Sequence, residues 1–393
     1  MAETATDAKL TVNDVRARVD ALVPALRERA RETEVQRGML PENLNALTEA
    51  GVFRLTLPTD RGGLQADITS INEILAQISR GDPSTGWMAA IITATNTWVG
   101  FFADEAAEEI LATPDLRVTG LIAPTGQARP VDGGVMVSGT WMWNTAGKHS
   151  NWVGLACMCA GDRGPTPIAC LVPTSSVTLH DTWDASGMSG TATNKITTED
   201  LFVPHSRVIA IPDLASGTFV PRKYGADPYY NRPAVHLFLA IQAGPMLGIG
   251  RGAMDVFLER LPGRAITYTS YADATQAPIT HRQVADAQQA LEIAEMYTTR
   301  IGQLVDGGLG SVPSIDDRVR VRAYLSQVTT YARECATVCY HASGASAIQN
   351  SVPIQRYFRD AHALSLHALQ QPDSAKELYG RHLLGLEPNT TLL

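Results

Sequence analysis

The stretch RYFRDAHALSLHA, from Arg356 to Ala368, determines how the rest of the chain is interpreted. It is expected to form one helix that carries both His362 and His367. His367 is five positions after His362, so the two lie about 140° apart around a helix and cannot face one small site equally. A histidine pair on an otherwise apolar helix indicates either core packing or chemistry. The sequence outside this stretch has to decide between them.

The composition is that of a globular protein with a large core. The 393 residues are 45% hydrophobic and 18% charged, which excludes a disordered chain. A formal net charge of −8 and the absence of a basic run argue against a nucleic-acid partner. The N-terminal segment has neither the basic start nor the apolar core of a signal peptide. Five cysteines without zinc-ligand spacing predict free thiols in a reducing cytoplasm and no metal site.

One segment, Pro83–Ala103, is uncharged and long enough to be compared with a membrane span. It also contains two glycines and several polar side chains, among them Thr93, Thr95 and Asn96. This mixture favours a helix buried in a large protein core, and we expect no membrane anchor.

Three zones follow one another along the chain and together predict an α+β fold: a helical domain over 1–115, a β-domain over 116–230 and a helical bundle over 231–393. Helical periodicity predicts helices over 12–37, 40–52, 67–82, 84–102, 234–261, 280–305 and 315–342. Short alternating runs between turn residues predict strands over 116–124, 134–143, 152–160, 168–173 and 194–204.

The run GPMLGIGRG contains Gly244, Gly248 and Gly252, spaced every four residues. A nucleotide-binding glycine loop requires a preceding strand, whereas these glycines lie within a helical pattern and share one face. The spacing therefore favours close helix–helix packing over phosphate binding.

The zone order, with GVFRLTLPTDRGGL (Gly51–Leu64) early and RYFRDA late, resembles the acyl-CoA dehydrogenase superfamily over nearly the whole chain. Within it, GTWMWNTAGKHSNW (Gly139–Trp152) is similar to a motif of the class D two-component flavin-dependent monooxygenases, with Thr145 and Ala146 in place of the family's Ser-Gly. The stretches APTGQARPVDGG, DTWDASGMSGTATNKITTEDLFVP and YGRHLLGLEPNT also look like this group. The resemblance implies an acyl-CoA dehydrogenase-like fold whose C-terminal domain is a four-helix bundle.

The resemblance also implies an activity. In such enzymes a separate NAD(P)H-flavin reductase supplies reduced FMN or FAD, which reacts with O2 to form a flavin hydroperoxide that oxygenates the substrate. The expected substrate is a small or polycyclic aromatic, phenolic in character, and the expected assembly is a homotetramer. Three alternatives stay open: oxygenation at nitrogen or sulfur, a flavin-bound acyl-CoA-type dehydrogenase or oxidase, and a non-catalytic scaffold subunit.

The residues around the C-terminal histidines distinguish a monooxygenase from a dehydrogenase. Acyl-CoA dehydrogenases commonly place a catalytic glutamate seven residues after the RDA triplet; here that position is Ala368, which cannot take a proton. His367 stands directly before it, where the monooxygenase relatives place a histidine facing the flavin. An imidazole can donate to or accept from a substrate hydroxyl. We therefore expect His367 to be catalytic and His362 to be structural.

The resemblance assigns two further catalytic residues. Thr145 occupies the place of a serine whose hydroxyl lies beside the reactive edge of the flavin, although a turn threonine is the plain alternative. Asn96, in ATNTW, stands where relatives place a histidine in the substrate pocket. An amide can orient a substrate hydroxyl but cannot act as a base near neutral pH.

Flavin binding is assigned to aromatic walls and phosphate donors. Trp141 and Trp143 are expected to pack on the isoalloxazine beside Thr145. Ser189 and Thr191, in GMSGTAT, stand where the superfamily uses hydroxyl and backbone donors. Arg264 looks like an arginine that relatives send to a phosphate, across a subunit interface in some cases. Backbone amides at Gly344 and Ala345 are expected to hold phosphate as well.

Overall fold

The structure, a computed structural model, describes residues 10–161, 164–216, 223–224, 226–390 and 392–393. Its N-terminal part is helical. The elements are α1 (Val12–Gln36), α2 (Pro41–Ala50), η1 (Val52–Arg54), η2 (Thr59–Arg61), α3 (Ile68–Gly81), α4 (Pro83–Asn96), η3 (Thr97–Phe101) and α5 (Asp104–Leu111). Local signals set the ends: Thr11 caps α1 through a capping box, and Gly51 stops α2 with φ 89°.

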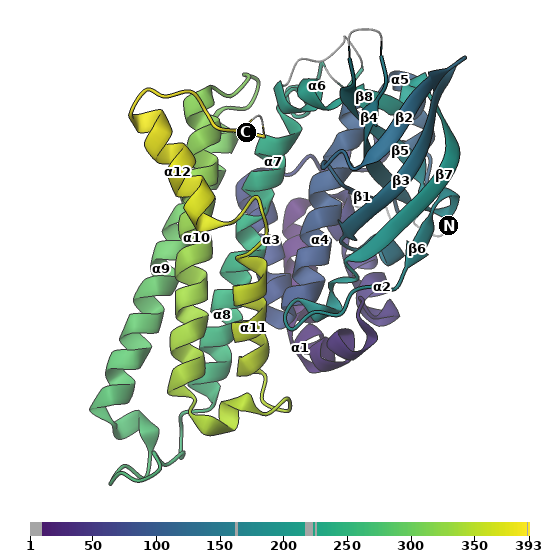
Figure 1. The fold of residues 1–393 in the computed structure, drawn as a ribbon. Helices are drawn as coiled ribbons and strands as arrows, with labels where there is room; N and C mark the ends of the chain where they lie inside the picture. The colour runs from purple at the N-terminus through teal and green to yellow at the C-terminus, as the bar shows by residue number, and fades with distance from the viewer. Residues whose placement is uncertain (1–9, 162–163, 217–222, 225, 391) are drawn as a thin grey trace, which may run out of the picture.

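Helix α4 forms the centre of the molecule, between the C-terminal helices and the sheet in Figure 1. All of its residues are buried, as expected for a helix that is apolar on every side. The prediction of a buried helix in this segment is confirmed. Among the described residues, no helix is both long and apolar enough to cross a membrane.

The middle of the chain forms a single mixed sheet that lies against α4 (Figure 1). The strands run in the order β6-β7-β3-β2-β4-β5-β8, and β1 pairs in parallel with β4. Their bounds are β1 (Val118–Gly120), β2 (Gly126–Val131), β3 (Gly134–Asn144), β4 (Trp152–Cys159), β5 (Thr166–Pro173), β6 (Thr178–His180), β7 (Asn194–Pro204) and β8 (Val208–Ala210). The short helices η4 (Gly147–His149), η5 (Thr174–Ser176), η6 (Ser189–Thr191) and η7 (His205–Arg207) interrupt them.

The C-terminal part is again helical, and α8 to α11 run side by side in Figure 1. The elements are α6 (Ile211–Ser216), α7 (Ala234–Ile241), α8 (Ala243–Glu259), η8 (Ala274–Gln276), α9 (Pro278–Gly307), α10 (Ile315–Ala342), η9 (Ala345–Ile348), α11 (Ile354–Leu364) and α12 (Pro372–Leu383). The helical, β, helical order predicted from the sequence is thus observed. All five cysteines are free thiols, and only Cys159 is partly exposed.

The glycine face of α8 packs directly on α3. A Cβ on Gly244 would lie 2.4 Å from the Asn72 carbonyl oxygen, and one on Gly248 would lie 2.2 Å from that of Ala76. Any larger residue would push the helices apart. The prediction of close helix packing over a phosphate loop is confirmed.

Two helix predictions are wrong in their extent. The expected helix over 234–261 breaks at Gln242, where the Asn72 side chain accepts from the Gly244 N–H and donates to the Ala240 carbonyl. The helix of the opening stretch ends at Leu364, so His367 lies in the following turn. The two histidines therefore do not share one helix, and the predicted angle between them does not apply.

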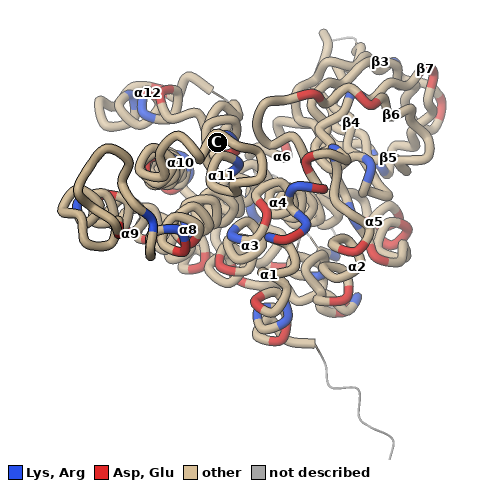
Figure 2. Tube along the Cα trace, turned by 90° about the horizontal axis from the view of Figure 1, so that it is seen from below, with Lys and Arg blue, Asp and Glu red and all other residues tan. Residues whose placement is uncertain are grey.

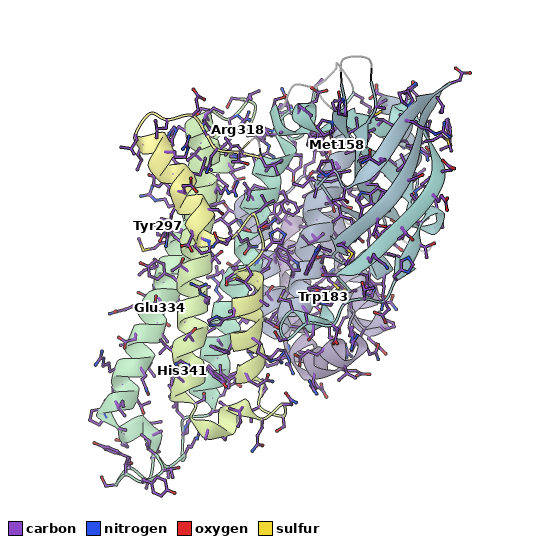
Figure 3. All side chains as sticks on the ribbon, in the orientation of Figure 1. Met158, Trp183, Tyr297, Arg318, Glu334 and His341 are labelled. Carbon is purple, nitrogen blue, oxygen red and sulfur yellow. The ribbon has the colours of Figure 1, made fainter. Side chains whose placement is uncertain are left out.

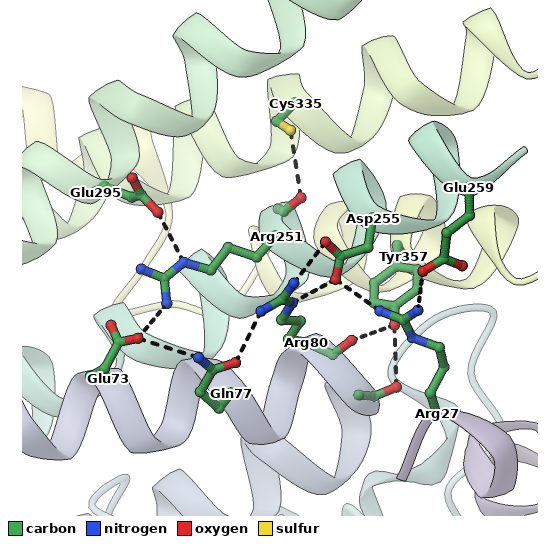
Figure 4. A network of polar contacts seen from close by, with 12 residues as sticks. Arg27, Glu73, Gln77, Arg80, Arg251, Asp255, Glu259, Glu295, Cys335 and Tyr357 are labelled. Carbon is green, nitrogen blue, oxygen red and sulfur yellow. Dashed lines mark hydrogen bonds and ion pairs between the residues drawn. The ribbon is translucent and has the colours of Figure 1, made fainter. Parts of the chain in front are cut away.

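An ionic network joins the helical layers beside α11 (Figure 4). Asp255 on α8 accepts from Arg80 on α3 at 2.5 and 2.9 Å and from Arg27 on α1 at 2.8 Å. Arg251 bridges Glu73 at 2.8 Å and Glu295 at 2.9 Å. The network borders a cleft of about 840 Å³ whose walls contain none of the predicted site residues. Figure 2 shows acidic and basic residues interspersed along these helices. We interpret the network as structural.

Candidate functional site

The turn that carries Thr145 follows β3 directly and is fixed from two sides. Its next residue, Ala146, has φ 59°; the Ala146 N–H donates to the Thr191 carbonyl at 3.0 Å. His149 Nε2 accepts from the Met39 N–H at 2.9 Å, which ties the same loop to the turn between α1 and α2. Burial, with the charges of Arg117 and Lys148, lowers the pKa of His149 to about 4, so this imidazole remains a neutral acceptor. His149 thus positions the Thr145 turn.

Three threonines form a continuous chain of hydroxyl contacts, which we call the hydroxyl relay. Thr145 Oγ1 lies 2.9 Å from Thr193 Oγ1, and Thr193 Oγ1 lies 2.7 Å from Thr191 Oγ1. Thr191 donates its hydroxyl hydrogen to the Met188 carbonyl at 2.8 Å. Thr145 is half-buried, whereas Thr191 is 1% exposed. Only the Thr145 end of the relay can meet a ligand.

The RDA triplet of α11 clamps the segment that holds the relay. Asp360 Oδ1 accepts from the Met188 N–H at 2.5 Å, and Arg359 donates to the Ser186 carbonyl at 2.6 Å. On its other side Arg359 donates to Glu34 at 2.5 Å, and Arg356 donates to the second oxygen of the same carboxylate at 2.9 Å. The opening stretch thus joins α1, α11 and the β-domain at one point.

The clamp contains buried carboxyl groups whose charge is disfavoured. Burial raises the pKa of Asp360 to about 7, and the nearby Glu34 and Asp82 charges act in the same direction. Burial likewise raises the pKa of Asp82 to about 6 against the opposing hydrogen bond from Thr85. Glu34 behaves differently: burial opposes its charge, yet Arg359 and Arg356 hold the pKa of this carboxyl below its ordinary value.

His367 lies against the first turns of α4. Its ring is 5.3 Å from that of Trp87 in an edge-to-face arrangement, and one turn earlier on α4 the side chain of Ser84 borders Gly190 of η6. The imidazole of His367 and the segment that holds the relay therefore both contact the N-terminal turns of α4. Burial lowers the pKa of His367 to about 4. Its Nδ1 accepts from the Leu369 N–H at 3.4 Å, which favours the tautomer with the hydrogen on Nε2.

The predicted aromatic walls divide into one buried and one exposed indole. Trp143 is 65% exposed, has φ 71°, and its ring lies 5.5 Å from that of Trp183. Figure 3 shows Trp183 where the β-domain meets the helices. Trp141, by contrast, is 1% exposed in the core of the β-domain, and its Nε1–H donates to the Ala156 carbonyl at 2.7 Å. The predicted flavin contact of Trp141 is contradicted because it has no surface to offer.

Asn96 does not fit its predicted role either. Its amide donates to the Phe53 carbonyl at 2.9 Å and to the Leu116 carbonyl at 3.3 Å, and its oxygen accepts from the Val118 N–H at 2.9 Å. With 0% exposure it ties the end of α4 to β1 and cannot orient a substrate. Direct flavin contact by the Thr191 side chain is excluded on the same ground, and its hydroxyl instead belongs to the relay.

His362 has a structural environment. Its ring packs 4.4 Å from that of Phe358, and Nε2 lies 3.1 Å from Thr337 Oγ1 on α10. The separation of the two histidines is therefore physical: His362 faces α10, and His367 faces α4.

Arg264 and the Gly344 turn, predicted separately, lie together at the other end of the bundle. Arg264 donates to the Ser343 carbonyl and to Ser346 Oγ at 3.0 Å, and Arg260 donates to the same hydroxyl at 3.2 Å. Gly344 has φ 68°, and a Cβ there would lie 3.4 Å from Arg264 Nη2. Among the described residues, neither arginine has a carboxylate within ion-pair distance. We call this group (Arg260, Arg264, Ser343–Ser346) the arginine end.

Comparison with known proteins places this geometry in a family. Residues 6–111 match the acyl-CoA dehydrogenase N-terminal domain and residues 240–372 the acyl-CoA dehydrogenase C-terminal domain. The oxygenase subunit HsaA of a flavin-dependent monooxygenase from Rhodococcus jostii is 31% identical over 382 residues, which cover 96% of this chain and all of HsaA. The chain belongs to the acyl-CoA dehydrogenase superfamily, among the oxygenase subunits of flavin-dependent monooxygenases.

Two other members of this family are informative. The oxygenase component of an FADH2-dependent resorcinol hydroxylase from Rhizobium sp. is 28% identical over 385 residues, covering 94% of each chain. The structure of XiaF from Streptomyces sp., in complex with FADH2 and glycerol, superposes with a TM-score of 0.89 at 25% identity, covering 96% of this chain and 97% of XiaF. The fold predicted from the sequence is confirmed by these matches.

Sequence reasoning missed the residues that act through others. Thr193, Met188 and Asp360 connect the relay to α11, and Arg260 doubles the charge at the arginine end. Thr191 and Thr193 stand two apart in GMSGTAT, but it is η6 and the positive φ of Ala192, not an extended backbone, that bring their hydroxyls together, so the spacing alone gave no signal. The contact with Thr145 joins segments 48 residues apart and had no local signal.

Proposed function

We propose that the chain is the oxygenase component of a two-component monooxygenase that hydroxylates a small or polycyclic aromatic, phenolic substrate. It would take reduced FMN or FAD from a separate NAD(P)H-flavin reductase and use O2 as co-substrate. The resorcinol hydroxylase among its relatives supports an aromatic substrate, and the FADH2 complex of XiaF supports reduced flavin as the cofactor. When bound, reduced flavin supplies the electrons that activate O2.

The observation that carries the proposal is the neutral imidazole of His367 beside the relay segment, next to a position where a dehydrogenase needs a carboxylate and this chain has Ala368. With its hydrogen on Nε2, the neutral His367 can donate a hydrogen bond to a substrate oxygen. Its packing against Trp87 excludes water from one side of the ring. These properties suit orientation of a phenolic oxygen better than removal of a proton from carbon.

The accessible residues fit a flavin. The exposed indole of Trp143 offers a flat apolar face for an isoalloxazine, and the hydroxyl of Thr145 and the side chain of Ser189 offer polar contacts nearby. The arginine end offers two guanidinium groups and the Ala345 N–H to a phosphate. The Gly344 N–H already donates to the His341 carbonyl at 3.1 Å, which contradicts its predicted phosphate contact. Desolvation and the charge of Arg264 lower the pKa of Arg260. The two guanidinium groups therefore repel each other, and a bound anion would stabilise both.

The positions of these groups support a flavin site shared between subunits. His367 comes after the last turn of α11, and the arginine end precedes its first turn. Figure 3 shows His341, two residues before Ser343, toward the lower end of the bundle and away from Trp183. A flavin that contacts both kinds of group would therefore be shared between subunits, which supports the proposed homotetramer. The free cysteines support a cytoplasmic location, where thiols stay reduced.

A single-turnover assay tests the activity. The protein is mixed anaerobically with reduced FMN or FAD and a set of phenols, and ¹⁸O2 is then added. A phenol that gains one labelled oxygen, detected by mass spectrometry, supports the proposal. Flavin oxidation at its rate in free solution without any labelled product overturns it, and anaerobic bleaching of bound oxidised flavin by an acyl-CoA thioester would point to the dehydrogenase instead.

A further inference from the structure

Only one hydrogen order of the hydroxyl relay makes all three of its contacts hydrogen bonds. A hydroxyl has a single hydrogen to donate, and Thr191 gives its hydrogen to the Met188 carbonyl at 2.8 Å. The 2.7 Å contact between Thr191 and Thr193 must then use the hydrogen of Thr193. The 2.9 Å contact between Thr193 and Thr145 must in turn use the hydrogen of Thr145. Reversal would leave the Thr191 and Met188 oxygens facing each other without a hydrogen between them.

The end that sets this order is held rigidly. The Met188 carbonyl also accepts from Trp183 Nε1–H at 2.9 Å, and the Met188 N–H donates to Asp360 at 2.5 Å. Thr191 is 1% exposed and Thr193 is 8% exposed, so water does not compete for their hydrogens. A burial of this kind makes an unmatched hydroxyl costly and keeps the order fixed.

The consequence falls on Thr145. Its hydrogen is committed to Thr193, so the half-buried Oγ1 offers a ligand only lone pairs. We propose that Thr193 and Thr191 are positioning residues that make Thr145 a pure hydrogen-bond acceptor and thereby make the site select reduced over oxidised flavin. This inference rests on the proposed function, because it takes the reactive edge of a flavin to lie at Thr145.

The chemistry of the flavin explains the selection. In the oxidised ring N5 is unprotonated and presents a lone pair, whereas in the reduced ring N5 carries a hydrogen. An acceptor-only hydroxyl matches the N5–H of reduced flavin and opposes the N5 lone pair of oxidised flavin. A threonine with a free hydrogen would serve both states. Selection of this kind suits an enzyme that must receive reduced flavin and release the oxidised form.

The test measures binding rather than turnover. Dissociation constants for oxidised and for anaerobically reduced FMN and FAD are determined for the wild type and for Thr193→Val, which keeps the shape but frees the Thr145 hydrogen. We expect the wild type to prefer reduced flavin and Thr193→Val to lower that preference about tenfold, chiefly by tighter binding of oxidised flavin. Thr193→Ser should restore the wild-type ratio. Thr197→Val, on β7 beside His180 and outside the relay, is the matched control.

A flavin analogue tests the same point without any substitution. Oxidised 5-deaza-FMN has a C–H in place of N5 and so lacks the opposed lone pair. The wild type should bind it several-fold more tightly than oxidised FMN, and Thr193→Val should bind the two alike if it folds.

The outcomes separate the two proposals. No binding of either reduced flavin by the wild type overturns the proposed function. Preferential binding of reduced flavin, with equal affinity for oxidised FMN and 5-deaza-FMN or with an unchanged ratio in folded Thr193→Val, overturns the relay and leaves the function standing.

Discussion

The two ends of α11 differ in how they treat charge. Along α11 itself, the buried Arg356 and the partly exposed Arg359 compensate the buried carboxylate of Glu34, and beyond its last turn the groups that face a ligand are neutral hydroxyl, imidazole and indole side chains. At the arginine end, two guanidinium groups stand without a carboxylate among the described residues. The first arrangement suits an uncharged ring that undergoes chemistry, and the second suits a phosphate that only anchors it. Charge is thus satisfied within the protein where chemistry is expected and left available where an anion is expected.

The largest effect is expected from breaking the charge compensation around Glu34. Glu34→Ala removes the carboxylate that holds Arg356 and Arg359, and it leaves the buried guanidinium of Arg356 and the partly exposed one of Arg359 without this partner. The free energy of unfolding should fall by about 3–5 kcal/mol, as for other buried ion pairs that lose one member. Urea denaturation at pH 7 measures it. Glu32→Gln, on the exposed side of α1, is the control; equal losses in the two variants would refute the clamp.

The next largest effect is expected from His367, a ligand-facing group beyond the last turn of α11. His367→Ala should lower labelled-product formation in the single-turnover assay about 100-fold, because an oriented hydrogen-bond donor to the reacting oxygen contributes on that order. His362→Ala, five residues earlier and facing α10, should leave product formation unchanged. Since burial lowers the pKa of His367 to about 4, the wild-type profile should show no inflection near pH 6.5. An inflection there that disappears in His367→Ala would contradict a neutral imidazole.

The arginine end gives a smaller and more selective effect. Arg264→Ala should weaken binding of reduced FMN roughly tenfold to thirtyfold, because it removes one charge-assisted contact to a phosphate. Binding of reduced riboflavin, which has no phosphate, should not change. Arg300→Ala, an exposed arginine on α9, controls for net charge. A similar loss for riboflavin and FMN would show that Arg264 acts on the bundle and not on an anion.

Most helices and strands could be predicted from the sequence because the residues that start, end and pack them lie within or next to each element. Pro41 and Gly51 bounded α2, Ser314 capped α10, and the glycine spacing of α8 identified its packing face. The missed strand β2 contains Pro130 and alternates arginine and glutamine with small residues, so it lacks the apolar pattern of the other strands. Its place in the sheet comes from pairing with β3 and β4.

The site was harder to predict because its contacts are not local. The turn at His367 has no proline until Pro372; the chain is held there by Gln370, which donates to Gln242 at 3.0 Å across 128 residues. Trp141 and Trp143 look alike in the sequence, yet the positive φ of Trp143 sends one indole outward while the other fills the β-domain core. Family resemblance located the region, and only the tertiary contacts separated ligand-facing residues from those that support them.

The smallest effect tests the buried acids directly. Burial raises the pKa of Asp360 to about 7 from an unfolded value near 4, so its favourable contribution is complete below about pH 4 and is lost as the pH rises through about 7. Asp360→Asn keeps an oxygen for the Met188 N–H and carries no charge. It should stabilise the protein by about 1 kcal/mol at pH 8 and reduce the fall in stability between pH 4 and 7. Asp82, with a pKa of about 6, retains part of that slope.

Urea denaturation at a series of pH values measures this, with the exposed Asp373→Asn as control. Equal slopes in Asp360→Asn and wild type would mean that Asp360 stays ionised in the fold, held by Arg359 as Glu34 is. In that case the clamp around α11 would contain a second compensated carboxylate besides Glu34. The Met188 N–H would then donate to an ionised carboxylate, and this stronger, charge-assisted hydrogen bond would fix the same hydrogen order more firmly.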